Sequence, residues 1–329
     1  MALADLRRQM RRDFGLVPEP VTLHAPVPEL LAGTWCVLRE TLVAGAAPRP
    51  LKEAVALAIS RANRCPYCVD AHSILLGATA EGGSAEVPGG ARDRRATDSS
   101  LAAVSRWAAA TGRGDSKELR SPPFPREHAP EYFGTAMAFH YINRMVLVRL
   151  GASPIPFRSR WLKGPLERIS SWMLSGAVRA PKEAGASLPF LPEAELPADL
   201  AWASSSPVVA AALARWSAAV ERSVEGLLPI GAREAVGKVV ERWRGGPPFG
   251  LERKLEEIGG GLAPADRVVS RLALLVALAP HRIDEGELAP LREAYPGDAP
   301  LISILAWGSL AAARRIAGWI AARAPSREA

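Results

Sequence analysis

Apolar residues recur at steps of three and four along most of the chain, a spacing that is typical of amphipathic α-helices. Runs in which β-branched and polar residues alternate, as they do in strands, are absent from the sequence. The pattern predicts helices over residues 51–62, 100–111, 131–150, 208–227, 232–244, 265–278 and 301–323. We therefore expect an all-α fold in which the helices form a bundle around a shared core.

Clusters of Gly, Pro and Ser interrupt the helical pattern and predict the connections between helices. These clusters lie at residues 82–100, 112–130, 151–165, 180–207 and 245–261. The stretch 180–207 carries five prolines, which do not continue a helix, and we interpret residues 181–206 as a linker. This interpretation divides the chain into a first domain, residues 1–180, and a second domain, residues 207–329.

The two halves share a weak internal repeat. In the first half, a helical pattern at 101–110 is followed by a polar loop and a long helical pattern at 132–149. In the second half, a helical pattern at 266–279 is followed by a loop and a long helical pattern at 301–323. A helix pair cannot bury its apolar face alone, so stacking of a second pair would complete the core. The sequence thus predicts a duplicated helical bundle.

The composition is that of an ordinary soluble globular protein. Hydrophobic residues make up 48% and charged residues 23% of the 329 positions, which excludes intrinsic disorder. The formal net charge of +7 is scattered and accompanies no nucleic-acid-binding motif, so we expect no nucleic-acid partner. No uninterrupted apolar run approaches the roughly 18–20 residues of a membrane span, and the charged N-terminus does not resemble a secretory signal. We expect a cytoplasmic protein without a membrane segment.

The chain has three cysteines, Cys36, Cys65 and Cys68. An odd and low number of cysteines argues against a secreted disulfide scaffold. Cys65 and Cys68 form a C-x-x-C pair, which in a cytosolic protein is typical of a redox-active or metal-binding site. Cys36 has no such partner, and we expect it to be a small buried hydrophobic residue.

The residues around the pair predict its local geometry. Asn63 is a suitable end for the helix at 51–62, because asparagine tolerates the left-handed backbone conformation. Pro66 disfavours helical geometry at Cys65 but suits the first turn of a new helix. Cys65 and Cys68 would then share one face at the beginning of this second helix, within reach of a disulfide. The N-terminus of a helix also stabilises a thiolate.

His72 and Glu53 are candidate acid–base groups. His72 lies four residues after Cys68 and hence on the same helix face, where its imidazole can accept or deliver the thiol proton. On one straight helix Glu53 would point away from the cysteines. A fold-back at the chain break would bring its carboxylate to His72 as an orienting group or proton acceptor. Ser60, seven residues after Glu53, has either a packing role or a polar role in the site.

Taken together, these residues resemble a known signature. A Glu, a C-x-x-C twelve residues later and a His four residues after the second Cys, with the sequence N-R-C-P-Y-C-V-D-A-H over 63–72, are similar to the AhpD-like branch of the carboxymuconolactone decarboxylase family. The sequence F-H-Y-I-N-R at 139–144 resembles a helix found downstream in peroxidase-related members. The resemblance covers roughly residues 14–150. It implies an all-α fold, thiol-dependent peroxidase or disulfide-reductase activity, and a homo-oligomer.

The resemblance also implies roles for four residues. Cys68 would be the thiolate that attacks the peroxide, and Cys65 would be the thiol that resolves the product. Glu53 and His72 would belong to a proton relay.

Three further residues are expected beside the relay as supporting groups. They are Tyr67, which stands where the best-known family members carry a histidine, Ser60, and His140 of the segment 139–144. The second half has no cysteine and no counterpart of His140, so it resembles a diverged copy without a catalytic site.

The predicted function is the reduction of a hydroperoxide at the expense of a dithiol donor. Attack by Cys68 gives a sulfenic acid, Cys65 condenses with it to a disulfide, and the external dithiol reduces the pair. This cycle needs no bound cofactor and no metal, and the sequence carries no Gly-rich phosphate-binding motif. Two alternatives stay open: a general thiol–disulfide oxidoreductase, and a zinc-binding or purely structural helical module.

Overall fold

The computed structural model describes residues 3–80, 90–150, 160–246 and 248–324. Within these ranges the chain forms helices and connecting turns with no strand, which confirms the all-α fold class. The α-helices are α1 (Leu3–Phe14), α2 (Glu19–Thr22), α3 (Pro28–Leu38), α4 (Arg49–Ala62), α5 (Pro66–Ala80), α6 (Gly90–Ala110), α7 (Ala129–Arg149), α8 (Arg160–Arg179), α9 (Pro207–Ser223), α10 (Ile230–Arg242), α11 (Leu251–Gly259), α12 (Pro264–Leu278), α13 (Glu285–Ala294) and α14 (Asp298–Arg323). A π-helical turn, η1 (Arg39–Val43), continues α3, and the 3-10 helices are η2 (Lys117–Arg120), η3 (Arg126–His128), η4 (Leu188–Phe190), η5 (Ala198–Ala203) and η6 (Pro280–Arg282).

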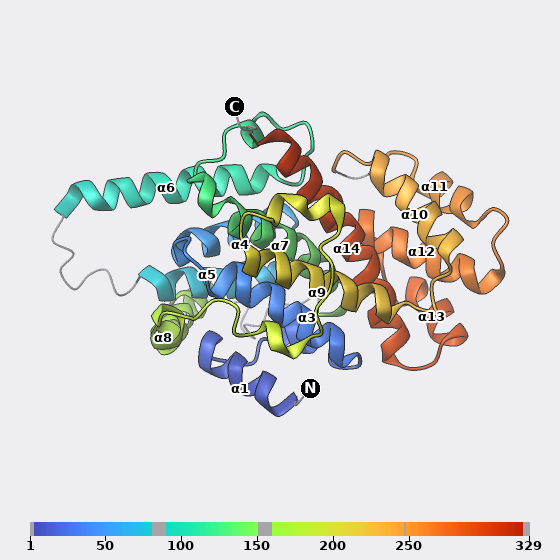
Figure 1. Ribbon diagram of the computed structural model, residues 1–329, viewed down its shortest axis with the longest axis horizontal. Coiled ribbons are helices and arrows are strands. Elements are labelled where there is room, and N and C mark those ends of the chain that lie inside the picture. Colours follow the sequence, from blue (N-terminus) through green and yellow to red (C-terminus); the bar gives the residue numbers. More distant parts are fainter. Residues whose placement is uncertain (1–2, 81–89, 151–159, 247, 325–329) are drawn as a thin grey trace.

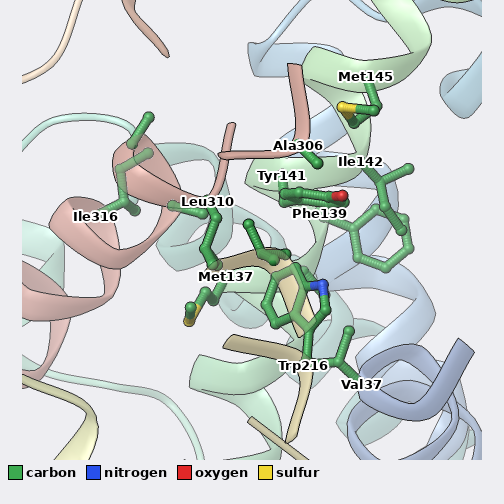
Figure 2. Close-up of a cluster of buried hydrophobic side chains, with 14 of the residues drawn as sticks. Val37, Met137, Phe139, Tyr141, Ile142, Met145, Trp216, Ala306, Leu310 and Ile316 are labelled. Atoms are coloured by element: carbon green, nitrogen blue, oxygen red, sulfur yellow. The ribbon is translucent and has the colours of Figure 1, made fainter. Parts of the chain in front are cut away.

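Helix α7 lies at the centre of the molecule and packs against both α4 and α14 (Figure 1). Its residues are buried without interruption from Pro130 to Val146, and a helix that is covered on all sides needs no polar stripe. Figure 2 shows Met137 and Tyr141 of α7 meeting Trp216 of α9 and Leu310 of α14. The core is continuous across both halves of the chain, and the two long helices of the predicted repeat are packed against each other. This arrangement supports a duplicated bundle.

The structure contains each helix that the periodicity predicts, with most ends shifted by a few residues. Three predicted connections are wrong in part. The loop at 82–100 is shorter, because α6 begins at Gly90, and residues 82–89 lie outside the described residues. The loop at 245–261 contains α11, and the end of the loop at 151–165 belongs to α8, while residues 151–159 are not described.

Several helices have no counterpart among the predicted ones, and α3 shows why. Every residue of α3 from Leu30 to Leu38 is buried, so the helix has no polar face and therefore no hydrophobic period to detect. In α13 the prediction fails for another reason, since Pro290 lies inside the helix and signals a break.

The helices of residues 180–206 are both 3-10 helices, α9 begins at Pro207, and buried polar groups hold the proline-rich stretch against η1. The Glu40 carboxylate accepts hydrogen bonds from the Gly185 amide at 2.7 Å and the Ser187 hydroxyl at 2.5 Å. Arg39 donates to the Glu183 carbonyl at 2.9 Å. The stretch is thus anchored on the first half, while the division into two domains stays a prediction.

Helix α14 is long and apolar enough, by length and composition, to cross a membrane. The expectation that no segment reaches this length therefore needs revision for α14. In the apolar 18-residue window of α14, 78% of the residues are buried inside the fold, as is typical of the core helix of a globular protein.

Gly308 marks a close approach between α14 and α12. A Cβ atom at Gly308 would clash with the carbonyl oxygen of Ala273 and with Cγ1 of Val276. Gly318, on the same helix, has open space around its Cβ position within 4 Å. The two glycines therefore form a matched pair, one needed by packing and one not.

We expect Gly308→Ala to lower the free energy of unfolding by about 1–3 kcal/mol, because the added methyl group forces the two helices apart. Gly318→Ala is expected to raise it by up to about 1 kcal/mol, because alanine favours the helix without a clash. Urea unfolding of both variants would measure the difference. Equal effects of the two substitutions would contradict the close crossing at Gly308.

Candidate active site

The break between α4 and α5 lies where the sequence predicted it. The residue with a left-handed backbone conformation is a different one from Asn63. Asn63 is the C-cap of α4, which confirms the predicted helix end, but its φ is an ordinary −79° and not left-handed. Arg64 takes that conformation instead, with φ of 54°. Pro66 then begins α5, which places Cys65 directly before the helix and Cys68 in its first turn.

The two thiols of the pair are in contact and almost fully buried. The Sγ atoms of Cys65 and Cys68 lie 2.6 Å apart. Cys65 is 0% exposed and Cys68 is 2% exposed, and both are free cysteines. Cys68 reaches the wall of a cavity, and Cys65 lies behind it. Only Cys68 is thus placed to meet a molecule that enters the cavity.

Glu53 and His72 meet across the α4–α5 interface, as the fold-back requires. The Nδ1 atom of His72 lies 2.7 Å from Oε2 of Glu53. The ring of His72 packs edge-on against Phe139 of α7, with centroids 4.5 Å apart. The imidazole is therefore held on one side by a carboxylate and on another by an aromatic ring, and it faces the same cavity as Cys68.

Glu53 is fully buried and is also bound by an arginine. Its Oε1 atom accepts a hydrogen bond from Nε of Arg49 at 2.7 Å. Burial by itself would raise the pKa of Glu53, but the charge of Arg49 and the bond with His72 outweigh burial and hold this pKa below its ordinary value. Glu53 is thus a carboxylate at neutral pH, ready to stabilise positive charge on the imidazole.

The cavity encloses about 230 Å³ between the segment after α1 and helices α3, α5, α7 and α8. Its wall is largely apolar and includes Leu16, Leu38, Phe139, Ile142 and Leu174. Cys68 and His72 are among the few groups in the wall that carry reactive atoms. The arrangement can accept a small molecule with an apolar body and bring its polar end to the thiol.

Tyr67 lies on the cavity wall next to Cys68. It binds Glu19 and not Glu53, the acid of the relay. Its hydroxyl donates to Oε2 of Glu19 in α2 at 3.0 Å. Burial, together with the nearby Glu19, raises the pKa of Tyr67, so the phenol stays protonated. The pair Tyr67–Glu19 links α2 to α5 along the cavity wall. The bond between Glu53 and His72 does not involve Tyr67.

Comparisons with known proteins place this site in a family. The model of the carboxymuconolactone decarboxylase family matches residues 28–86, which include the C-x-x-C pair and both relay residues. Over 324 residues, the chain is 38% identical to the protein named alkyl hydroperoxide reductase Rv2159c of Mycobacterium tuberculosis (strain ATCC 25618 / H37Rv), covering 98% of this chain and 92% of the relative. This chain belongs to the carboxymuconolactone decarboxylase family. No solved structure was found to match it.

Within this family the protein is AhpD-like, and the segment 139–144 contributes a polar network behind its thiols. Nδ2 of Asn63 donates to Oδ1 of Asn143 at 2.9 Å and lies 3.2 Å from Nδ1 of His140. Nδ2 of Asn143 donates to the Ser60 hydroxyl at 3.2 Å. Nε2 of His140 lies 2.8 Å from the Thr111 hydroxyl. Ser60 and His140 thus belong to one buried network.

Asn143 is one residue of the candidate site that the sequence did not single out. Its side chain donates a hydrogen bond to Ser60 and lowers the pKa of Cys68, so it connects the network to the candidate nucleophile. The sequence carried a signal for it, since Asn143 belongs to the segment 139–144, which resembles a helix of peroxidase-related members. Its role depends on which face of the buried helix α7 meets α5, and periodicity does not give that for a helix covered on all sides.

The acidity of Cys68 in this AhpD-like protein differs from the expectation. Burial raises the pKa of Cys68 well above its ordinary value, the adjacent Cys65 raises it further, and the hydrogen bond from Asn143 lowers it only in part. The helix N-terminus alone therefore does not make the resting thiol acidic. Deprotonation of Cys68 needs a base, and His72 is the base that shares its cavity.

The arrangement of candidate metal ligands bears on the zinc-binding alternative. Across the described ranges, no group of three or more His, Cys, Asp or Glu side chains is arranged so that it could hold a metal ion. Oε2 of Glu53 binds the imidazole of His72, and Oε1 binds Arg49. Both oxygens of Glu53 and the Nδ1 atom of His72 are thus already hydrogen-bonded within the protein.

Proposed function

We propose that this AhpD-like protein is a thiol-dependent peroxidase that reduces organic hydroperoxides and is itself reduced by a dithiol donor. The observation that carries the proposal is the position of Cys68 on the wall of an apolar cavity, beside His72, whose imidazole is bound by the Glu53 carboxylate. The relative's name, alkyl hydroperoxide reductase, supports the same chemistry.

The proposed reaction begins with proton transfer from the Cys68 thiol to His72. The thiolate attacks the terminal oxygen of the hydroperoxide, the O–O bond breaks, and Cys68 becomes a sulfenic acid. The leaving alkoxide takes the proton from His72 and departs as an alcohol. Glu53 stabilises the imidazolium that exists between these two transfers.

Cys65 then resolves the sulfenic acid. Its sulfur attacks the sulfur of Cys68, a disulfide forms, and water leaves with the proton of the Cys65 thiol. Exchange with an external dithiol returns both cysteines to thiols and oxidises the donor to its disulfide. One hydroperoxide and one dithiol are thus converted to one alcohol, one water and one donor disulfide.

The wall of the cavity favours an organic substrate over hydrogen peroxide. An alkyl or aryl group that enters the cavity leaves water for an apolar surface, whereas hydrogen peroxide has no such group. We also propose a cytoplasmic location, where the pair is kept reduced between turnovers, and a homo-oligomer.

The experiment compares cumene hydroperoxide with hydrogen peroxide, using dithiothreitol as the donor. We expect dithiol-dependent consumption of both, with kcat/KM at least about 10-fold higher for cumene hydroperoxide because of its buried phenyl group. A protein that consumes neither peroxide under these conditions is not a peroxidase. Equal kcat/KM for the two would contradict the role of the apolar cavity.

A further inference from the structure

Arg49 binds the oxygen of the Glu53 carboxylate that does not face His72. It is the first residue of α4, one helical turn before Glu53, and this spacing places the two side chains together. Nε of Arg49 donates to Oε1 at 2.7 Å, while Oε2 of Glu53 faces His72 at 2.7 Å. Each oxygen of the carboxylate thus has one partner, a cation on one side and an imidazole on the other.

Within the part of the chain that the structure describes, no other ion pair joins Glu53 to a lysine or arginine. Among the described residues, the cation paired with Glu53 is Arg49, and its other partner, His72, is charged only when it is protonated. Glu53 is 0% exposed, so water cannot compensate its charge. A buried carboxylate without a cation binds a proton, because burial disfavours the charged form.

The Arg49 side chain is itself fixed in place. Its guanidinium carbon lies 5.9 Å above the ring centroid of Phe14, which belongs to the cavity wall. The side chain is 12% exposed, and the terminal nitrogen nearest Glu53 lies 2.5 Å from Oε1. The guanidinium therefore lies between the cavity wall and the relay.

The charge on Glu53 decides which way its hydrogen bond with His72 runs. An ionised carboxylate only accepts hydrogen bonds, so Nδ1 of a neutral His72 must carry the proton and Nε2 is left free as a base. A protonated Glu53 can donate to Nδ1 instead. The neutral imidazole then carries its proton on Nε2 and cannot accept the proton of Cys68.

We propose that Arg49 is a positioning residue of the peroxidase reaction, which keeps Glu53 as a charged acceptor and thereby selects the tautomer of His72 that can take the thiol proton. The inference rests on the proposed function for its kinetic part. Its structural part, the tautomer of His72, can be measured without any turnover.

The test uses the variants Arg49→Gln and Arg49→Lys of the full chain. We expect Arg49→Gln to lower kcat/KM for cumene hydroperoxide about 10²-fold or more at pH 7, within the range for loss of an acid–base group. The loss should shrink as the pH rises, because Glu53 then ionises without its cation. Arg49→Lys restores a charge and should recover much of the rate. Arg61→Gln, an exposed position on the same helix, is the control and should act like wild type.

Nitrogen-15 NMR of the histidine side chains provides the second readout, and a chain with five histidines is simple enough for assignment by a His72→Gln spectrum. We expect the Nδ1–H tautomer of His72 in wild type and the Nε2–H tautomer in Arg49→Gln. An unchanged tautomer, or a loss of rate that is the same at every pH, would overturn the proposal. Absence of peroxidase activity in wild type would remove the proposed function, while the spectra would still decide the role of Arg49.

Discussion

The Cys68→Ser variant is expected to lose dithiol-dependent peroxide consumption by a factor of about 10³ or more, because a serine hydroxyl is a far weaker nucleophile than a thiolate. Cys68 is the sulfur on the cavity wall, whereas Cys65 lies behind it. A steady-state assay with cumene hydroperoxide and dithiothreitol measures the loss.

The Cys65→Ser variant separates the two thiols. It should complete one fast reaction with peroxide and then stop, because Cys68 reaches the sulfenic acid and has no partner to resolve it. A sulfenic-acid reagent followed by mass spectrometry would locate the adduct. Cys36→Ala, which changes a buried residue away from the cavity, is the matched control and should turn over like wild type. An adduct on Cys65 of the Cys68→Ser variant would reverse the assignment.

The same thiol sets the expected pH dependence. Burial and the adjacent Cys65 raise the pKa of Cys68, so the fraction of thiolate grows as the pH rises from neutral into the alkaline range. The rate of the first reaction with peroxide should increase over that range. A rate that falls with rising pH would show that another group limits the reaction.

The second large effect is expected for the relay. We expect Glu53→Gln and His72→Gln each to lower kcat/KM about 10²–10⁴-fold, the usual range for loss of a general acid–base group. Because Glu53 acts through His72 at 2.7 Å, the double variant should be no slower than the worse single variant. The measurement is a double-mutant cycle on kcat/KM for cumene hydroperoxide. Multiplied effects in the double variant would show that the two residues act independently.

The relay carboxylate also affects the stability of the fold. Since the pKa of Glu53 is lower in the folded protein than its ordinary value of 4.5, the ionised group stabilises the folded state above about that pH. This contribution is lost as the pH falls through the lower, folded-state pKa. Glu53→Gln should therefore reduce the difference in stability between pH 7 and acid.

Much of the local site could be predicted because short-range rules govern it. The spacing of Cys65, Cys68 and His72 fixes their shared helix face, and Pro66 fixes where that helix begins. The approach of Glu53 to His72 needed one further event, the fold-back between α4 and α5, which the break at residues 63–66 indicated.

The cavity could not be predicted, because residues far apart in the sequence build it. Leu16 follows α1, Ile142 lies on α7 and Leu174 lies on α8, and their meeting depends on how whole helices pack. Helices that are buried on all sides, such as α3 and much of α7, also carry no period that would say which face meets which neighbour.

Two residues of the site were missed for different physical reasons. Arg49 precedes Glu53 by four positions, a spacing that on exposed helices marks a weak surface ion pair. Its importance comes from the complete burial of Glu53, which the sequence does not show. Asn143 reaches Cys68 from another helix, and only the packing of α7 on α5 brings them together.

Cys36 gives the protein an internal reporter of global unfolding. It is 0% exposed in α3, and burial raises its pKa to about 12, so in the native state it has neither access to solvent nor a reactive thiolate. In a chain in which both cysteines of the C-x-x-C pair are replaced, Cys36 is the one remaining thiol, and its rate of alkylation reports how often the whole core opens. The alkylation rate of Cys36 thus measures the lifetime of the native state without an added label.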